Sequence, residues 1–183
     1  MQIKYVAASI ALMLGTAGPA LAQTPPPPPP AEAKASAMPY VMAAGMSDQF
    51  EIQSSQIALQ KSPNAATRKY AQMLIRHHQK TTAATLKAAR KAGMSPTPPA
   101  LDPRAQPSIA ELQNAAATDF DRVYFGQQVP AHQAALDLHQ SYAQGGDQAP
   151  LRTTARTAVP IVRQHLRDAE RMMSGGKHNM RGM

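Results

Sequence analysis

Four long stretches of helical periodicity, separated by short breaks, constrain the fold of this chain more than any other feature. From Met38 onward the chain is rich in Ala, Gln, Leu, Met and Lys, and its apolar residues recur at the spacing of a helix. Breaks that contain proline or glycine fall at residues 62–63, 93 and 145–146. Because short loops of this kind join neighbouring antiparallel helices, the sequence predicts an all-α fold, an antiparallel four-helix bundle.

The sequence also predicts where the first two helices meet. Ser62 is a suitable N-cap and Pro63 suits the first position of a helix, so the second helix is expected to begin at Pro63 and to end at Gly93. Residues 94–107 contain five prolines, which predict an extended connection across one end of the bundle. A short extra helix is expected next, over residues 108–116.

The second pair of helices is predicted from residue 118 or 119 to residues 145–146, and from Asp147 to residues 175–176. Pro130 and Pro160 lie within these two patterns and are expected to kink the helices. With an up-down-up-down order, the two short turns would lie at the same end of the bundle.

Residues 1–22 have the pattern of a secretory signal peptide. Lys4 precedes an apolar run, and the small-residue triplet at residues 20–22 predicts cleavage after Ala22. The apolar run is too short for a permanent transmembrane helix, and no later segment approaches the roughly 20 apolar residues that a spanning helix needs. The sequence therefore predicts an exported, periplasmic protein that is not transmembrane.

Three further segments are predicted after the signal peptide. Residues 23–37 form a linker in which Pro25 to Pro30 hold a polyproline II rod of roughly 20 Å, which would act as a spacer. Residues 38–174 form the helical bundle domain, and residues 175–183 form a disordered tail.

The composition excludes several classes of site and partner. The chain has no cysteine, which excludes disulfides, zinc–thiolate sites, iron–sulfur clusters and covalent haem. Its formal net charge is +8, but the predicted export and the lack of interleaved aromatic residues argue against nucleic acid as a partner. A solvated basic surface is the simpler interpretation, and peripheral contact with anionic membrane lipid or lipopolysaccharide is the alternative. Other partners and the oligomeric state are left open.

Four stretches of the chain resemble a known family. They are residues 43–51, residues 70–80, residues 120–124 with His132-Gln133, and residues 159–166. In this order and spacing they are similar to the family catalogued as domain of unknown function 4142, over residues 38–173. The resemblance implies a ferritin-like four-helix bundle behind a signal peptide, and no established activity. The family tends to carry an acidic residue directly before the histidines of the second and third helices, where this chain has His77 and Ala131.

Ferritin-like bundles can hold a di-iron centre, and this chain lacks the residues for one. That centre needs a Glu from each of two helices and a Glu-x-x-His motif from each of the other two. Apolar residues stand three positions before His78, His132 and His165. Glu51 is the only glutamate of the four long predicted helices before Glu170. The sequence therefore argues against a ferroxidase, and the lack of a Ser-His-Asp or phosphate-loop pattern leaves an enzymatic role unsupported.

A set of polar residues on the packed faces of the helices remains as a candidate site. Imidazole suits copper or zinc better than it suits hard ions, so a His-based copper or zinc site is one interpretation. The candidate metal ligands are Asp48, Glu51, His78, His132 and His165.

Distances along the predicted helices rank these candidates. Measured from the shared end of the bundle at about 1.5 Å per residue, Asp48, His78 and His132 fall within about one helical turn of one another. His132 is expected at about 20 Å from that end and His165 at about 28 Å. These two histidines are therefore not expected to share an ion.

The other interpretation of the same residues is structural. Buried histidines that hydrogen-bond to neighbours such as Tyr124 or Gln128 would fix the register of the helices. His77 and His139 are expected at the edges of the packed faces. The leading hypothesis from the sequence is a non-enzymatic periplasmic bundle with an interaction or stress-related role, and metal binding and contact with an anionic surface are the alternatives.

Overall fold

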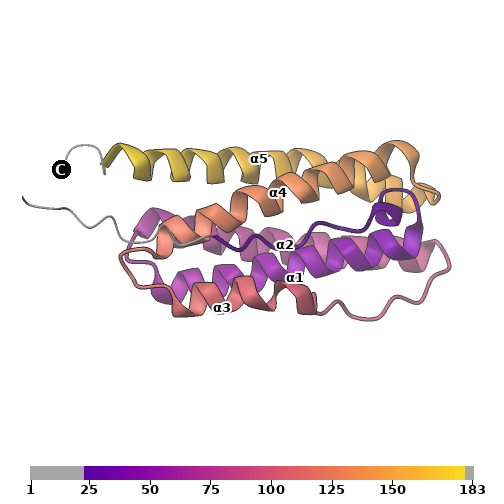
Figure 1. Ribbon diagram of the computed structural model, residues 1–183. Coiled ribbons are helices and arrows are strands. Elements are labelled where there is room, and N and C mark those ends of the chain that lie inside the picture. The colour runs from indigo at the N-terminus through magenta and orange to yellow at the C-terminus, as the bar shows by residue number, and fades with distance from the viewer. Residues whose placement is uncertain (1–22, 180–183) are drawn as a thin grey trace, which may run out of the picture.

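The computed structural model describes residues 23–179, with side chains to residue 175, and all regular structure in this part is helical. The long helices α1, α2, α4 and α5 form the bundle (Figure 1). The bounds are α1 (Ala37–Lys61), α2 (Ala65–Lys91), α3 (Gln106–Asn114), α4 (Phe120–Gly145) and α5 (Ala149–Asn179), with short 3-10 helices η1 (Ala31–Lys34) and η2 (Pro103–Ala105). The predicted all-α four-helix bundle is confirmed. Within the described residues, no helix is both long enough and apolar enough to cross a bilayer.

The two short turns of the bundle lie at opposite ends (Figure 1). At one end α1 begins beside the α4–α5 turn, where the backbone N–H of Ala37 donates to Asp147 Oδ2 at 3.2 Å. At the other end the α1–α2 turn lies beside the start of α4, where Ser62 Oγ donates to Asp121 Oδ1 at 2.6 Å. The expectation of an up-down-up-down order with both turns at one end is therefore wrong.

The connection from α2 to α4 runs along the length of the bundle (Figure 1). The prediction that it crosses one end of the bundle is therefore wrong. The connection's proline-rich residues 94–102 are extended, and at about 3.1 Å per residue they reach far enough to return along most of a bundle helix. The α3 helix within this connection packs on α1 and α4. A bundle with one long crossover is the arrangement of ferritin-like folds.

The ends of α2 illustrate how far local signals fix the helix bounds. The cap is Asn64, whose side chain accepts a backbone N–H of the first turn, so Ser62 is not the cap and α2 begins two residues later than predicted. The predicted end is confirmed. Gly93 has a φ of 77°, and the Met94 N–H donates to Ala89 O at 3.1 Å, which is the pattern of a Schellman motif.

Other bounds differ more. The helix predicted over residues 108–116 lies at Gln106–Asn114, because Pro107 fits its first turn. The α5 helix continues to Asn179, so the end predicted at residues 175–176 is wrong. Pro130 and Pro160 both lie inside continuous helices. Residues 1–22, with the predicted cleavage site, and residues 180–183 lie outside the described part of the chain.

The segment predicted as a spacer lies against the bundle. Ala33 of η1 is fully buried, and η1 packs on both α1 and α4. Residues 26–30 line a shallow pocket together with α1 residues such as Phe50. The Thr24 N–H also donates to Glu111 Oε2 at 2.9 Å. The prediction of a free spacer is wrong, because α1 and α4 cover part of the apolar surface of the proline rings.

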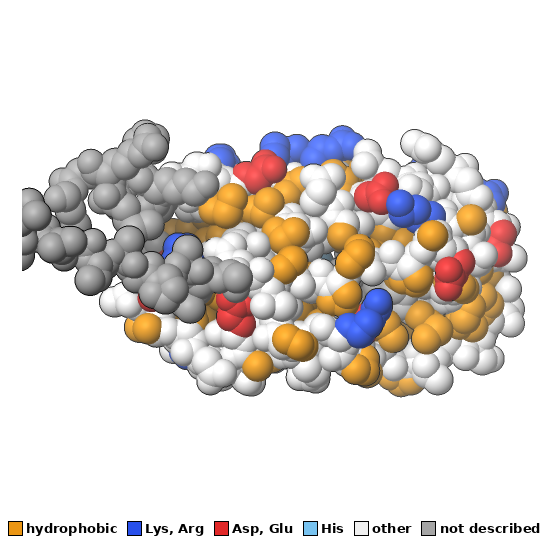
Figure 2. Space-filling view, in the orientation of Figure 1, with side chains coloured by type: hydrophobic (Ala, Val, Ile, Leu, Met, Phe, Trp, Pro, Cys, Tyr) orange, Lys and Arg blue, Asp and Glu red, His pale blue; other side chains and the backbone are white. Residues whose placement is uncertain are grey.

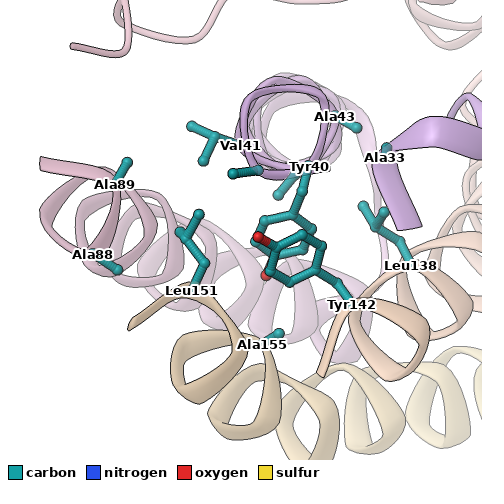
Figure 3. Close-up of a cluster of buried hydrophobic side chains, with 12 residues drawn as sticks. Ala33, Tyr40, Val41, Ala43, Ala88, Ala89, Leu138, Tyr142, Leu151 and Ala155 are labelled. Carbon is teal, nitrogen blue, oxygen red and sulfur yellow. The ribbon is translucent and has the colours of Figure 1, made fainter. Parts of the chain in front are cut away.

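The core contains an apolar cluster towards each end, a polar layer between them, and two smaller apolar clusters, one of α1, η2, α3 and α4 residues and one between α4 and α5. The cluster at the start of α1 contains Tyr40 and Tyr142, whose rings stack with centroids 3.9 Å apart (Figure 3). The cluster at the other end includes Leu74, Phe120 and Tyr124. The polar layer lies between these clusters along all four helices, and it contains the residues of the candidate site.

Candidate metal centre

Three histidines from three different helices meet in the polar layer. His78 of α2, His132 of α4 and His165 of α5 each offer one ring nitrogen, and these nitrogens lie within 4.8 Å of one another. The three side chains are 3 %, 0 % and 1 % exposed, so the cluster is closed to bulk solvent. The ring centroids of His132 and His165 are 5.3 Å apart. The expectation that these two histidines could not share an ion is therefore wrong.

The error arose from the helix bounds and the topology. His132 precedes the end of α4 at Gly145 by thirteen residues, and His165 follows the start of α5 at Ala149 by sixteen. At about 1.5 Å per residue, both lie about 20–24 Å from the α4–α5 turn. Residues 146–148 of the turn are not helical, so counting them as helix places His165 too far from this end of the bundle. His78 precedes the end of α2 at the same end of the bundle by thirteen residues, so all three rings share one level.

Each histidine uses one ring nitrogen in a hydrogen bond. The bonds join His78 Nδ1 to Asp48 Oδ1 at 2.7 Å, His132 Nδ1 to the backbone oxygen of Gln128 at 2.9 Å, and His165 Nε2 to His77 Nδ1 at 2.8 Å. The other three nitrogens are buried and have no hydrogen-bond partner among the described residues. Buried polar atoms normally have partners, so three unpartnered nitrogens on side chains of one cluster are an unusual concentration.

The hydrogen bonds decide which form of the rings is present. A carbonyl or carboxylate oxygen only accepts, so the Nδ1 atoms of His78 and His132 carry the hydrogen. In the neutral ring of His132, Nε2 then keeps its lone pair, whereas the protonated form of His78 carries a hydrogen on both nitrogens. When His165 Nε2 donates to His77, its Nδ1 keeps a lone pair in the same way. Hydrogen bonding through the far nitrogen is the usual way in which proteins orient metal-binding histidines.

Burial keeps two of the three clustered histidines, His132 and His165, neutral. It lowers the pKa of His132 to about 3 and that of His165 to about 2, and the positive charge of His78 acts in the same direction. For His78 burial alone would lower the pKa, but the hydrogen bond to Asp48 and the charge of that carboxylate outweigh burial and raise it. Two of the three rings therefore present free lone pairs at neutral pH, which metal binding requires.

The two predicted carboxylates have different surroundings. Asp48 accepts hydrogen bonds from His78, Thr81 and Thr82, so it lies behind His78 and outside the group of free nitrogens. Glu51 is 1 % exposed, its Oε1 lies 3.7 Å from His132 Nδ1, and neither of its oxygens has a hydrogen-bond partner among the described residues. Burial raises the pKa of Glu51 to about 7. One carboxylate thus orients a ring, and the other lies unpartnered beside the cluster.

Two further histidines extend this layer. His139 was expected at an edge but is 6 % exposed, and its Nδ1 lies 3.0 Å from the Tyr40 hydroxyl. His77 is half-buried, stacks on His165 with ring centroids 5.1 Å apart, and lines a cavity of about 270 Å³ between α2 and α5. Because adjacent residues of a helix point about 100° apart, His77 faces α5 while His78 faces the bundle centre. The contact between His77 and His165 could have been predicted from the sequence only if α5 had been known to lie beside α2.

The donor set suits a borderline or soft ion. Nitrogen ligands at about 2.0–2.1 Å from one ion are roughly 3.3–3.6 Å apart, so nitrogens that now lie up to 4.8 Å apart would have to approach one another by at most about 1.2–1.5 Å. Three imidazoles favour copper or zinc, and a single nearby carboxylate is too little oxygen for a di-iron or calcium site.

Comparisons with known proteins identify the fold and the family. The domain described as "Domain of unknown function (DUF4142)" matches residues 22–172. Solved structures of CopM in its Ag-bound, Cu(I)-bound and Cu(II)-bound forms align with TM-scores of 0.63, 0.65 and 0.64 and identities of 18, 17 and 16 %. Each alignment covers 76 % of this chain and 96–98 % of the CopM chain. At this identity the likeness shows a shared bundle fold. No curated protein matches the sequence significantly.

Proposed function

The chain belongs to the family catalogued as domain of unknown function 4142, and from this premise we propose that it is an exported protein that binds one copper ion at His78, His132 and His165. One observation carries the proposal. Three buried ring nitrogens from three helices converge without hydrogen-bond partners, while the opposite nitrogen of each ring is fixed by a neighbour. A purely structural network would use these nitrogens in hydrogen bonds.

Copper is favoured over zinc by two considerations. CopM, which shares the bundle fold, has been solved in Cu(I)-, Cu(II)- and Ag-bound forms. In addition, three imidazoles with no thiolate form a compact nitrogen site that suits Cu(I), whereas Zn²⁺ would require a fourth ligand and Cu(II) favours a tetragonal set of ligands. Glu51 is the only described carboxylate with free oxygens beside the cluster, and it would supply that ligand or balance the charge of the ion.

The residues around the ligands have defined tasks in this proposal. Asp48 holds the ring of His78, the Gln128 carbonyl holds the ring of His132, and His77 holds the ring of His165. Such neighbours fix the tautomer and raise the basicity of a metal-bound imidazole. The buried position closes the ion off from solvent, which suits storage or sequestration of copper in a stress-related role and offers no open position for catalysis.

Competition with a chromophoric copper chelator tests the proposal. Purified protein in a reducing buffer should take up one Cu(I) per chain, and the His78→Ala/His132→Ala double variant should lose at least a hundredfold in affinity. His139→Ala is the matched control, because His139 is also a buried histidine but lies outside the cluster. Its affinity should stay within about threefold of the unmodified protein.

The proposal fails if the double variant, while still folded by circular dichroism, binds copper as tightly as the His139→Ala control. If the same cluster bound Zn²⁺ more tightly than copper, the proposed metal site would stand, but its assignment to copper would be wrong.

A further inference from the structure

The charges of this protein are divided between two sides of the bundle. The α2 helix carries seven Lys and Arg residues and no acidic residue, and the described side chains of α5 include five Arg against two acidic residues. The remaining described residues carry four basic against nine acidic side chains. Among the described side chains, the α2–α5 side therefore has a formal charge of +10 and the rest −5. The overall value of +8, which also counts Lys4, Lys177 and Arg181, conceals this division.

The basic residues on each of these helices form a stripe along the outer surface. On α2, five of the seven basic residues recur at intervals of seven and four residues, which places them on one side of the helix, and these five are exposed. On α5 the intervals are four and seven residues, and Figure 2 shows Lys and Arg side chains gathered along the edge of the molecule formed by α5. The stripes comprise Lys69, Arg76, Lys80, Lys87 and Lys91 on α2, and Arg152, Arg156, Arg163, Arg167 and Arg171 on α5.

Little on this side neutralises the stripes. Lys34, Arg104 and Arg122, which lie outside α2 and α5, each form an ion pair with an aspartate. Among the described Lys and Arg residues of α2 and α5, only Arg171 forms an ion pair, with Asp168. The short helices outside the bundle do not shield the stripes either, because η1 and α3 pack on α1 and α4.

We propose that the α2–α5 side is a docking surface for the phosphate headgroups of anionic membrane lipid. The stripes extend about 33 Å on α2 and about 29 Å on α5, which fits an extended anionic surface better than a single small ligand. Each Lys or Arg near such a surface strengthens binding by about fivefold, so the ten residues together produce substantial attraction. The contact is peripheral, since no described helix can cross a bilayer.

Nucleic acid is the other polyanion that a basic surface can bind, and the surface lacks a feature of such sites. Single-stranded nucleic acid binding uses exposed aromatic side chains for base stacking. The only aromatic residue of α2 apart from its histidines is Tyr70, which is 6 % exposed, and α5 has no Phe, Tyr or Trp. The groove between the two helices is lined mainly by threonine and alanine. This composition favours lipid, and the proposal does not depend on copper binding.

Two variants of equal net charge separate a docking surface from a general effect of charge. The first carries Lys69→Gln, Arg76→Gln, Lys80→Gln and Lys87→Gln on the α2 stripe. The second carries Gln106→Glu, Gln113→Glu, Gln133→Glu and Gln144→Glu, all exposed positions on α3 and α4. Each variant lowers the net charge by four, and none of the eight side chains lies in the histidine cluster.

Co-sedimentation with vesicles of phosphatidylethanolamine and about 30 mol% phosphatidylglycerol at about 0.1 M salt is the measurement. The unmodified protein should bind these vesicles, should not bind pure phosphatidylcholine, and should be released by about 1 M salt. The α2 variant should lose at least tenfold in partitioning, and the α3–α4 variant less than threefold. Equal losses in the two variants, no binding of the unmodified protein, or tighter binding of a single-stranded oligonucleotide than of the vesicles would each overturn the proposal. Thermal melts verify that all three proteins are folded.

Discussion

The aromatic end of the bundle core and its histidine-rich middle solve the problem of burial in opposite ways. Around Tyr40 and Tyr142 the rings stack, and the hydroxyl of each makes a hydrogen bond, to His139 and to Asp147 respectively. In the middle, one nitrogen of each of His78, His132 and His165 and both oxygens of Glu51 are buried without partners in the described part of the chain. Unpartnered buried groups cost stability, so the middle layer is poor as a structural element and well suited to a ligand. The aromatic end of the four helices thus stabilises the fold, and the middle of the same helices is the level suited to binding.

Truncation at the aromatic end should give the largest effect on stability. Tyr142→Ala removes a fully buried ring that stacks on Tyr40 and donates to Asp147 at 2.8 Å, so the free energy of unfolding should fall by about 3–5 kcal/mol in urea. Below the urea transition the variant should still take up copper with an affinity within about threefold of the unmodified protein. A large loss of affinity in the folded variant would show that the two levels are not independent.

Removing the negative charge of Asp48, which lies behind His78, should lower the affinity for copper. Asp48→Asn keeps the shape of the side chain but removes the carboxylate that accepts from His78 and two threonines, so copper affinity should fall about 10- to 100-fold in chelator competition. Thr82→Val is the milder control, because it removes one hydrogen bond to Asp48 and leaves the charge in place. An unchanged copper affinity of the Asp48→Asn variant would show that Asp48 does not contribute to the metal site.

Low pH should reduce the free energy of unfolding of the copper-free protein, because the histidines of the middle layer become protonated on unfolding. The pKa values of His132, His139 and His165 are lowered from 6.5 to about 3, about 4 and about 2, so their contribution to stability is present above pH 6.5 and is lost as the pH falls below it. Glu51, with its pKa raised from 4.5 to about 7, and His78, whose pKa is raised, have the opposite dependence and offset part of the loss.

Urea unfolding at pH 7 and pH 5.5 measures the balance, which we expect to be a net loss of about 1 kcal/mol at the lower pH. A His139→Gln/His165→Leu variant should reduce this dependence or reverse its sign. Greater stability of the unmodified protein at pH 5.5 would contradict the neutral state of these histidines.

The smallest effect is expected at His77. This side chain is half-buried, so water can replace part of its hydrogen bond to His165 Nε2 when it is removed. His77→Ala should therefore lower copper affinity only about three- to tenfold, and the exposed neighbour Gln79→Ala should have no effect. A loss as large as that of the His78→Ala/His132→Ala variant would make His77 a ligand itself.

The fold could be predicted from the sequence to a large extent because its signals are local. Helical periodicity, the glycine at 93 and the glycine pair at 145–146 gave the four long helices and two of their ends. The direction of the second helix pair was missed, since it depends on whether residues 94–119 cross one end or return along the bundle. Extended proline-rich backbone can do either, and tertiary packing of α3 on α1 and α4 decides between them.

The candidate site was predicted in composition and not in geometry. All three histidines of the cluster were among the predicted ligands, but the pairing of His165 with His132 depends on helix bounds that sequence signals fix only to within a few residues. The roles of Asp48 and His77 depend on which helices are neighbours, so no spacing along the chain could have supplied them.

X-ray absorption at the copper edge tests the central claim most directly. The protein loaded with one equivalent of Cu(I) should show a shell of three nitrogen ligands at about 2.0 Å, with the multiple scattering of imidazole rings and no sulfur shell. The His139→Ala variant should give the same spectrum. A sulfur shell, which would place the copper at methionines, or an unchanged spectrum in the His78→Ala/His132→Ala variant, would contradict copper binding by the buried histidine cluster.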